Sequence, residues 1–297
     1  MTVLVAVDTT PDAPIAVAVA QAIARQLGAR LEGLHVSSAP VSEGDVRPLL
    51  GLSGEEGESI HLRLDVGNPA HEIVAASSDG TVVLVVIAAG MPTDESPVGP
   101  VALEVVRHTH RPLVVVYPAK LAGEGRSPGP VRRLLVPVDG TPSTGRALRP
   151  VMALAHELGA SVDLLYVAGF QRSSSEPGTL SAPRYVDQPQ HEWPSWSGEV
   201  VDRLLRCLAR CPEDVPAEIH LATGDVAEEI ARFALEHRED AIVLARRSQL
   251  EPGNGKVVWD VFQNNPLPLV FITAQFRHAG SNATAPYRGP SGGARVA

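Results

Sequence analysis

The chain has 297 residues, about twice the length of an ordinary single domain, and therefore predicts two domains. Its formal net charge of −9 and pI near 5.6 give a surface that repels phosphate backbones, which excludes a general binder of nucleic acids or anionic membranes. Aromatic residues make up 4% of the chain while Val, Ala and Leu dominate, which favours parallel strands covered by helices over a platform of stacked aromatics.

The N-terminal segment predicts no export. It has no basic leader, and its apolar run of five residues is too short for a signal sequence. The longest apolar stretch, Val82–Ala89, is far shorter than the roughly 18 residues that a membrane span requires, so it predicts a buried strand. We therefore expect a cytoplasmic protein with small-molecule or protein partners and no membrane contact.

The first half of the chain predicts strands that alternate with helices. Apolar β-branched runs indicate the strands, apolar residues at helical spacing indicate the helices, and Gly28 is suited to end the first helix. In chain order we expect a strand over Val3–Asp8, a helix over Ala13–Leu27, a strand over Arg30–Val36, a strand ending near Gly67 and then a helix, a strand over Val82–Ala88, a helix over Val101–His108 and a last strand opened by Pro112.

The second half repeats this order. Asp139 matches Asp8 at an offset of 131 residues, and the offset holds as far as Val167, which matches Val36. The corresponding elements are Leu134–Asp139, Ser143–Leu158, Ser161–Val167, the segment around Gly224, Ala241–Ala245, Val257–Gln263 and the strand opened by Pro268. Gly224 matches Gly67 at an offset of 157, so the second copy has gained 26 residues. We place this insertion at 169–196, a segment rich in Ser, Pro and Gly, and predict a surface loop there.

This alternation predicts the fold class. Strands joined through helices require right-handed crossovers and a parallel sheet covered on both faces. We therefore expect an α/β protein with two tandem, doubly wound, parallel five-stranded sheets. The first domain is predicted at 1–119 and the second at 131–275, with a Gly- and Pro-rich linker at 120–130 and a disordered tail at 276–297.

The order and spacing of these motifs resemble the universal stress protein family. The resemblance rests on Val136–Thr141, on Gly224–Ile230, on the late glycines Gly99 and Gly255, and on the closing apolar strands. It implies the adenine nucleotide alpha hydrolase-like fold in each domain, with ATP bound by some members and not by others. It also implies pairing of the last strands, 112–117 and 268–273, which would here join the two halves of one chain as a pseudo-dimer.

The resemblance also implies where a nucleotide would bind. Ligands of open α/β sheets lie beyond the carboxyl ends of the strands. The family's aspartate hydrogen bonds near the adenine and ribose, and the valines lie where the family offers backbone atoms to the base. The candidates at this edge are Asp8, Val36 and Gly67 in the first domain and Asp139, Val167 and Gly224 in the second. The alternatives, that the aspartates cap the following turns and the valines belong to the core, stay open.

The phosphate-binding loops have decayed in both copies. A triphosphate needs a glycine-rich loop ahead of a helix, because only bare backbone brings the amides close enough to the anion. Both copies keep the last glycine, Gly99 and Gly255, but have lost the two upstream glycines of the family pattern. Pro100, which donates no N–H, follows Gly99, so we expect the first site to be disabled. Lys256 and Arg246 could still bind an anion such as ATP in the second domain, with solvated charge as the alternative.

No catalytic constellation is evident in the sequence. The ten histidines are scattered along the chain. Cys207 and Cys211 lie four residues apart in a segment with helical periodicity, and we expect them to be unreactive thiols packed against other side chains. We predict no metal site. The segment that ends in Gly255 and Lys256 is not a Walker phosphate-binding loop. Leu250 stands where that motif requires glycine, and Val257 stands where it requires serine or threonine. The turns after the first strands do not fit an ATP pyrophosphatase, and no long flavin-binding segment indicates an electron-transfer flavoprotein. We expect a non-enzymatic stress-response or regulatory module that contacts an unknown protein partner through 169–196. The alternative is an ATP-binding stress sensor that uses mainly the second domain, with slow hydrolysis at most.

Overall fold

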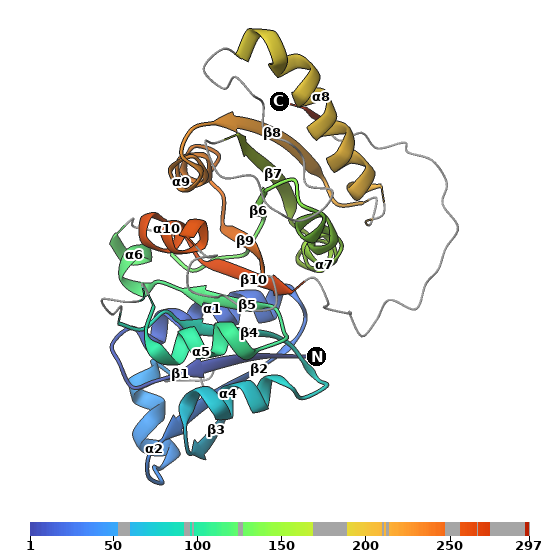
Figure 1. Ribbon diagram of the computed structural model, residues 1–297. Coiled ribbons are helices and arrows are strands. Elements are labelled where there is room, and N and C mark those ends of the chain that lie inside the picture. Colours follow the sequence, from blue (N-terminus) through green and yellow to red (C-terminus); the bar gives the residue numbers. More distant parts are fainter. Residues whose placement is uncertain are drawn as a thin grey trace. The chain divides into compact units, whose positions relative to one another are not determined.

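A computed structural model (Figure 1) describes residues 1–52, 60–91, 96, 98–123, 127–168, 189–209, 211, 214–246, 256–265, 267–273 and 295–296. The chain forms two compact units. The first contains Met1–Val131 together with Asn265–Phe271, and the second contains the other described residues from Arg132 onward. We describe each unit by itself.

The first unit is a sheet with helices on both faces (Figure 1). Its strands lie in the order β10-β5-β4-β1-β2-β3 and are parallel, except that β10 pairs antiparallel with β5. The strands are β1 (Thr2–Val7), β2 (Arg30–Ser37), β3 (His61–Val66), β4 (Val82–Ala88), β5 (Leu113–Val116) and β10 (Leu269–Thr273). The helices are α1 (Ala13–Gln26), α2 (Glu43–Val46), the 3₁₀ helix η1 (Arg47–Leu50), α4 (Pro69–Ser77), α5 (Pro100–His108) and α6 (Pro118–Gly123).

The central strands of this unit are apolar because both of their faces are covered. All six residues of β1 are buried, and β1 pairs with β4 on one side and β2 on the other. Gly28 follows Leu27, the C-cap of α1, and has a φ of +59°, a left-handed conformation that a side chain would strain. It ends the helix as the sequence predicted.

The second unit repeats this arrangement. Its parallel strands lie in the order β11-β8-β7-β6-β9. They are β6 (Arg133–Val138), β7 (Ser161–Ala168), β8 (Ala217–Thr223), β9 (Ala241–Arg246) and β11 (Arg295–Val296). The helices are α7 (Pro142–Leu158), α8 (Pro189–Leu208), α9 (Val226–Glu236) and α10 (Lys256–Asn264). None of the helices in the described ranges is long and apolar enough to cross a membrane.

The strand registers agree with the internal repeat. Equivalent cross-strand pairs are Leu4 with Glu32 and Leu135 with Asp163, followed by Glu32 with His61 and Asp163 with Glu218. The offsets of 131 and 157 residues read from the sequence therefore describe the same positions in two sheets. The predicted fold class, tandem α/β repeats with parallel sheets, is confirmed.

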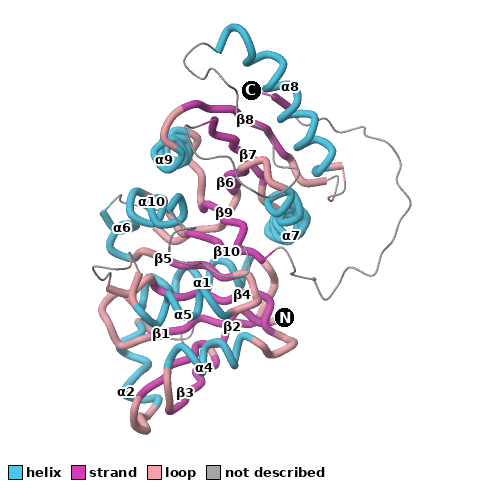
Figure 2. The backbone as a smooth tube through the Cα atoms, in the orientation of Figure 1, coloured by secondary structure: helices cyan, strands magenta, loops and turns pink. Residues whose placement is uncertain are grey.

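Three segments differ from the sequence expectation (Figure 2). Helix α6 extends into the segment 120–130, where glycines and prolines predicted an irregular linker. Residues 189–196, expected within an inserted loop, form the first part of α8. Arg295 and Val296, expected in a disordered tail, form β11 because the open edge of β8 offers backbone partners. The remainder of the predicted loop, 169–188, lies outside the described residues, and the domain boundaries stay predictions.

Candidate functional site

The two strand-end aspartates organise the turns that follow them. Oδ1 of Asp139 accepts hydrogen bonds from the backbone N–H of Thr141 at 2.9 Å and from its hydroxyl at 2.7 Å. Oδ1 of Asp8 accepts the equivalent bonds from Thr10 at 3.0 and 2.5 Å. This is the turn-capping geometry that the sequence left open as an alternative. Both aspartates are exposed, and their role toward a nucleotide stays a prediction.

The turns themselves differ between the repeats. Gly140 has a φ of +68°, and Thr141 caps α7 by accepting a hydrogen bond from the N–H of Thr144. In the first repeat Thr9 takes the place of Gly140. Helix α1 begins after Asp12, whose side chain makes no capping hydrogen bond. The second repeat therefore has the more tightly ordered turn.

Gly67 and Gly224 accommodate a glutamate from the next helix. A Cβ added to Gly67 would lie 3.0 Å from Oε1 of Glu72, and one added to Gly224 would lie 3.1 Å from Cγ of Glu229. Gly67 and Gly224 also have positive φ values of +156° and +141°, a backbone conformation that explains why both positions are glycine. Val36 and Val167 are half-buried near the ends of β2 and β7. The valines and glycines lie at the carboxyl edge of each sheet. The glutamate side chains, Glu72 and Glu229, already lie close to Gly67 and Gly224.

The loop before α5 closes on itself. The backbone N–H of Gly99, the first amide of the expected phosphate cradle, donates to the carbonyl oxygen of Ala89 at 2.7 Å. A Cβ added to Gly99 would lie 3.2 Å from the carbonyl oxygen of Met91 and 3.4 Å from that of Ala89. The next residue is Pro100, which has no N–H. The Gly99 amide is therefore hydrogen bonded within the loop, and the residue after it has no N–H to offer a phosphate.

The corresponding loop of the second repeat is only partly described. Arg246 is the last residue of β9 and Lys256 is the first of α10, so the backbone brings both to the same loop. Gly255 and the side chains of Arg246 and Lys256 lie outside the described residues. Anion binding by this loop stays a prediction.

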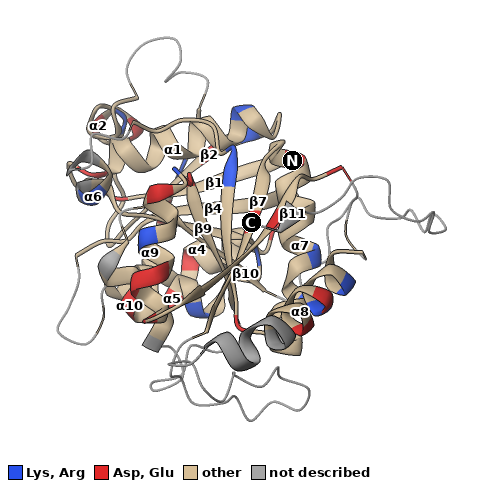
Figure 3. Cartoon of the chain, turned by 90° about the horizontal axis from the view of Figure 1, so that it is seen from above, with Lys and Arg blue, Asp and Glu red and all other residues tan. Residues whose placement is uncertain are grey.

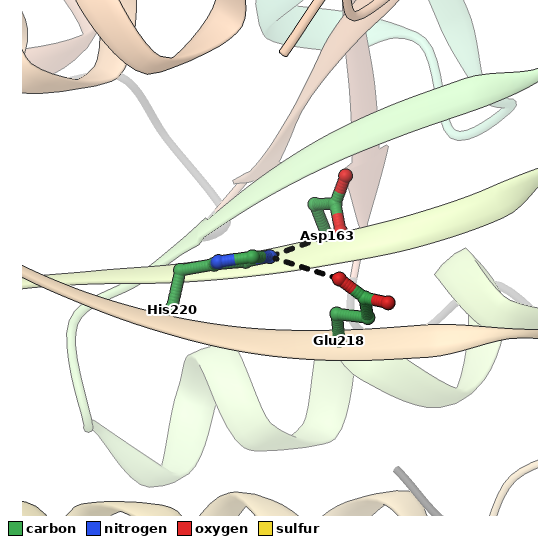
Figure 4. Close-up of side chains that lie close together, drawn as sticks. All are labelled: Asp163, Glu218 and His220. Atoms are coloured by element: carbon green, nitrogen blue, oxygen red, sulfur yellow. Dashed lines mark hydrogen bonds and ion pairs between the residues drawn. The ribbon is translucent and has the colours of Figure 1, made fainter. Parts of the chain in front are cut away.

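A polar cluster that the sequence did not predict lies in the amino-terminal half of the strands of the second unit (Figure 4). Nε2 of His220 lies 3.1 Å from Oδ1 of Asp163 and 3.8 Å from Oε2 of Glu218. Asp163 comes from β7, and Glu218 and His220 are two residues apart on β8, so all three side chains share one face of the sheet. The side chains of Asp163 and His220 are 5% and 8% exposed, and that of Glu218 is 47% exposed.

Arg133 and Glu239 extend this cluster. Arg133, at the start of β6, places its guanidinium 2.6 Å from Oδ2 of Asp163 and 3.4 Å from Oε1 of the fully buried Glu239. Burial alone would raise the pKa of Asp163, but hydrogen bonds with His220 and Glu239 and the charge of Arg133 lower it. Burial and the neighbouring Asp163 raise the pKa of Glu239. Asp163 is thus the ionised member of the two buried acids.

Aromatic packing fixes the imidazole of His220. Its ring centroid lies 4.7 Å from that of Phe233 and 5.4 Å from that of His237. Phe233 and His237 stack on each other at 3.8 Å and come from the end of α9 and the residue after it. The ring is held with Nε2 directed at the carboxylates, an arrangement suited to an ion pair or to a metal ligand.

The sequence concealed this cluster because its members are far apart in the chain. Asp163 and Glu218 become neighbours only when β7 pairs with β8. The one available signal was the pair Glu218 and His220, two ionisable residues that alternate with apolar ones along a strand. The prediction of no metal site rested on the two cysteines and the scattered histidines, neither of which reveals this combination.

The fold and the strand-end turns define an α/β protein of two nucleotide-fold repeats. The sequence model of the universal stress protein family matches residues 130–272, so the second repeat belongs to that family and the family predicted from the motifs is confirmed. A universal stress protein from Archaeoglobus fulgidus is similar over 92% of this chain and 98% of its own, with a TM-score of 0.60 and 14% identity. A Pseudomonas aeruginosa protein of unknown function is similar over 92% of both chains, with a TM-score of 0.62 and 13% identity. A sequence search of curated proteins gives no significant match.

Proposed function

We propose that this chain is a tandem universal stress protein that acts as a non-enzymatic regulatory module of the stress response, with the nucleotide site of its first repeat closed. The observation that carries this proposal is the hydrogen bond from the Gly99 N–H to the Ala89 carbonyl, at 2.7 Å. A triphosphate needs free N–H groups at the start of the helix. Here the N–H of Gly99 is already hydrogen bonded to Ala89 within the loop. The next residue, Pro100, has no N–H to donate.

The charge distribution supports a protein or small-molecule partner over a polyanion. Both α8 and α9 bear acidic and basic residues close together (Figure 3), and Arg232 forms ion pairs with Glu229 and Glu236 on its own helix. With a net charge of −9, such a surface lacks the long-range attraction that nucleic acid binding requires. We propose that a protein partner binds through 169–196 in the cytoplasm.

Strand pairing offers a second structural role. Leu269, Val270 and Phe271 of β10 pair antiparallel with Val115, Val114 and Leu113 of β5. These strands close the two sequence repeats, and antiparallel pairing satisfies backbone groups that an edge strand would expose. We propose that pairing between 112–117 and 268–273 makes the chain a pseudo-dimer, which supports a regulatory module that needs no second copy.

The second candidate function is an ATP-binding sensor that uses the second repeat. The ordered turn favours it, because Gly140 is left-handed and Asp139 remains exposed beside the capped start of α7. Lys256 begins α10 and would supply positive charge to an anion. The two functions differ in whether the second repeat binds nucleotide.

Calorimetry with ATP and Mg²⁺ separates the two candidates. The titrations compare the unaltered chain with Asp139→Ala and with the matched variant Asp8→Ala. The regulatory module predicts no saturable heat for any of the three. Saturable heat that Asp139→Ala abolishes and Asp8→Ala retains would establish the sensor instead, and phosphate release in the same samples would measure hydrolysis. Heat abolished by Asp8→Ala alone would contradict a closed first site.

A further inference from the structure

Two carboxylates of the second repeat oppose each other across a strand pair. Asp163 on β7 is the direct register partner of Glu218 on β8, so both side chains leave the sheet on the same face at neighbouring positions. Like charges directly opposite one another destabilise a sheet. Arg133 already pairs with Asp163, and a cation between the two carboxylates would offset the repulsion that Glu218 adds.

An imidazole nitrogen completes a set of three ligand atoms. One atom each from Asp163, Glu218 and His220 lie within 4.8 Å of one another, and Nε2 of His220 is 3.1 and 3.8 Å from the two carboxylate oxygens (Figure 4). Ligands about 2.0–2.2 Å from a tetrahedral zinc ion are separated by roughly 3.3 Å. The two spacings from His220 are close to this value, and a bound ion would draw the two carboxylate oxygens, which lie within 4.8 Å of each other, closer together.

The surroundings position these ligands in the way that metal sites require. Arg133 binds Oδ2 of Asp163 at 2.6 Å and leaves Oδ1 directed toward His220. Phe233 and His237 pack against the imidazole and fix its plane. Hydrogen bonds to a ligating carboxylate, such as the one from Arg133, orient it toward a metal, and the ring contacts hold the imidazole in place. Glu218, which is 47% exposed, provides the side from which an ion and its water can enter.

We propose that Asp163, Glu218 and His220 bind one divalent transition-metal ion of the zinc class, with solvent completing its coordination on the side of Glu218. An imidazole with two carboxylates is a donor set that suits Zn²⁺ and its neighbours better than Mg²⁺ or Ca²⁺, which prefer oxygen ligands alone. The ion would lie in the amino-terminal half of the strands, away from the edge where nucleotides bind in this fold. Its role is to link β7 and β8 of the second repeat.

Zinc titration of the chelator-treated full chain tests this proposal. Calorimetry measures the Zn²⁺ affinity, and the visible absorption of bound Co²⁺ reports nitrogen and oxygen ligation directly. We expect one saturable site per chain. Glu218→Gln is the decisive variant because the side chain is half exposed and its loss should leave the fold intact, which circular dichroism checks. The affinity should fall at least ten-fold in this variant, and His220→Gln should abolish the Co²⁺ spectrum.

The matched control is His156→Gln. Nδ1 of His156 lies 2.8 Å from Oδ2 of Asp214, but both side chains are more than half exposed and no third ligand atom accompanies them in the described part of the chain. Zinc affinity should stay within two-fold of the unaltered chain. The proposal is overturned by the absence of a saturable zinc site, by an undiminished affinity in folded Glu218→Gln, or by an equal loss in His156→Gln.

Discussion

The same three positions carry different charges in the two repeats, Glu32, His61 and Arg63 in the first and Asp163, Glu218 and His220 in the second. In the first, Glu32 faces His61 across the strands, and Arg63 stands where His220 stands in the second. Arg63 lies 2.6 Å from Asp65, so the first repeat supplies its own cation. In the second, Asp163 faces another carboxylate, Glu218. Both repeats thus contain an internal ion pair near these positions, and only the second adds a facing carboxylate, Glu218, that an external cation would neutralise.

Burial differs as well. His61 and Arg63 are exposed, whereas Asp163 and His220 are buried beneath the end of α9. Phe233, which packs on His220, has Ala76 as its counterpart in the first repeat. The aromatic ring of Phe233 shields His220 from water, which the methyl group of alanine cannot do, while Glu218 and Arg133 stay partly exposed. Charges in the second repeat therefore interact in a less polar environment and matter more for stability.

The largest expected effect comes from removal of Asp163. Asp163→Ala leaves Arg133 with the longer contact to Glu239 at 3.4 Å in place of its 2.6 Å contact, and removes the hydrogen-bond acceptor of the buried His220. Breaking a fully buried pair costs about 3–5 kcal/mol in the free energy of unfolding. Because the Arg133 side chain is 42% exposed and solvent screens its charge, we expect the lower end of this range, about 3 kcal/mol. Glu32→Ala at the equivalent, half-buried position should cost about 0–1 kcal/mol. Urea unfolding in the presence of EDTA measures both, and equal losses would contradict the difference between the repeats.

Zinc should stabilise the second repeat alone. At a free concentration one hundred times the dissociation constant, a ligand that binds only the folded state adds about 2.7 kcal/mol. Differential scanning calorimetry should show a rise of several degrees in the melting temperature of the unaltered chain. The rise should disappear in Glu218→Gln and persist in His61→Gln, its counterpart in the first repeat. A loss of the rise in His61→Gln would place the ion elsewhere.

The closed loop of the first repeat predicts a smaller effect. In Gly99→Ala the new methyl group meets backbone carbonyl oxygens at 3.2 and 3.4 Å, which cannot move as a flexible side chain would. We expect a loss of about 1–2 kcal/mol, as for other overpacked sites. Gly80→Ala, where nothing lies within 4 Å, should change stability by less than about 0.5 kcal/mol. Indistinguishable unfolding midpoints would mean that the loop around Gly99 is open.

The smallest effect concerns the thiols, which report on the second repeat because the chain has cysteines only at 207 and 211. Burial raises the pKa of Cys211 to about 11, so only about one thiol in a thousand is ionised at pH 8. Iodoacetamide should alkylate Cys211 of the folded chain very slowly at pH 8 and faster as the pH approaches 11. Mass spectrometry after timed labelling follows this rate. Rapid labelling at pH 8 would show that α8 opens at its end.

Much of the architecture was predictable because it depends on local pattern. The runs Val3–Asp8 and Leu134–Asp139 predicted the central strands, and their offset of 131 residues predicted equivalent registers, which Leu4 with Glu32 and Leu135 with Asp163 confirm. The start of α8 and the edge strand β11 were not predictable in this way. Their sequences have weak periodicity, and β11 forms only where β8 offers an open edge.

The sequence by itself determined the repeat, the family and the loss of the phosphate-binding glycines, because these are properties of residue order and spacing. Tertiary structure alone decided that Asp163 meets Glu218 and His220, and that the Gly99 amide is satisfied by Ala89. Strand pairing and loop closure bring together groups that are distant in the chain. The burial and charge that control their chemistry arise only from those contacts.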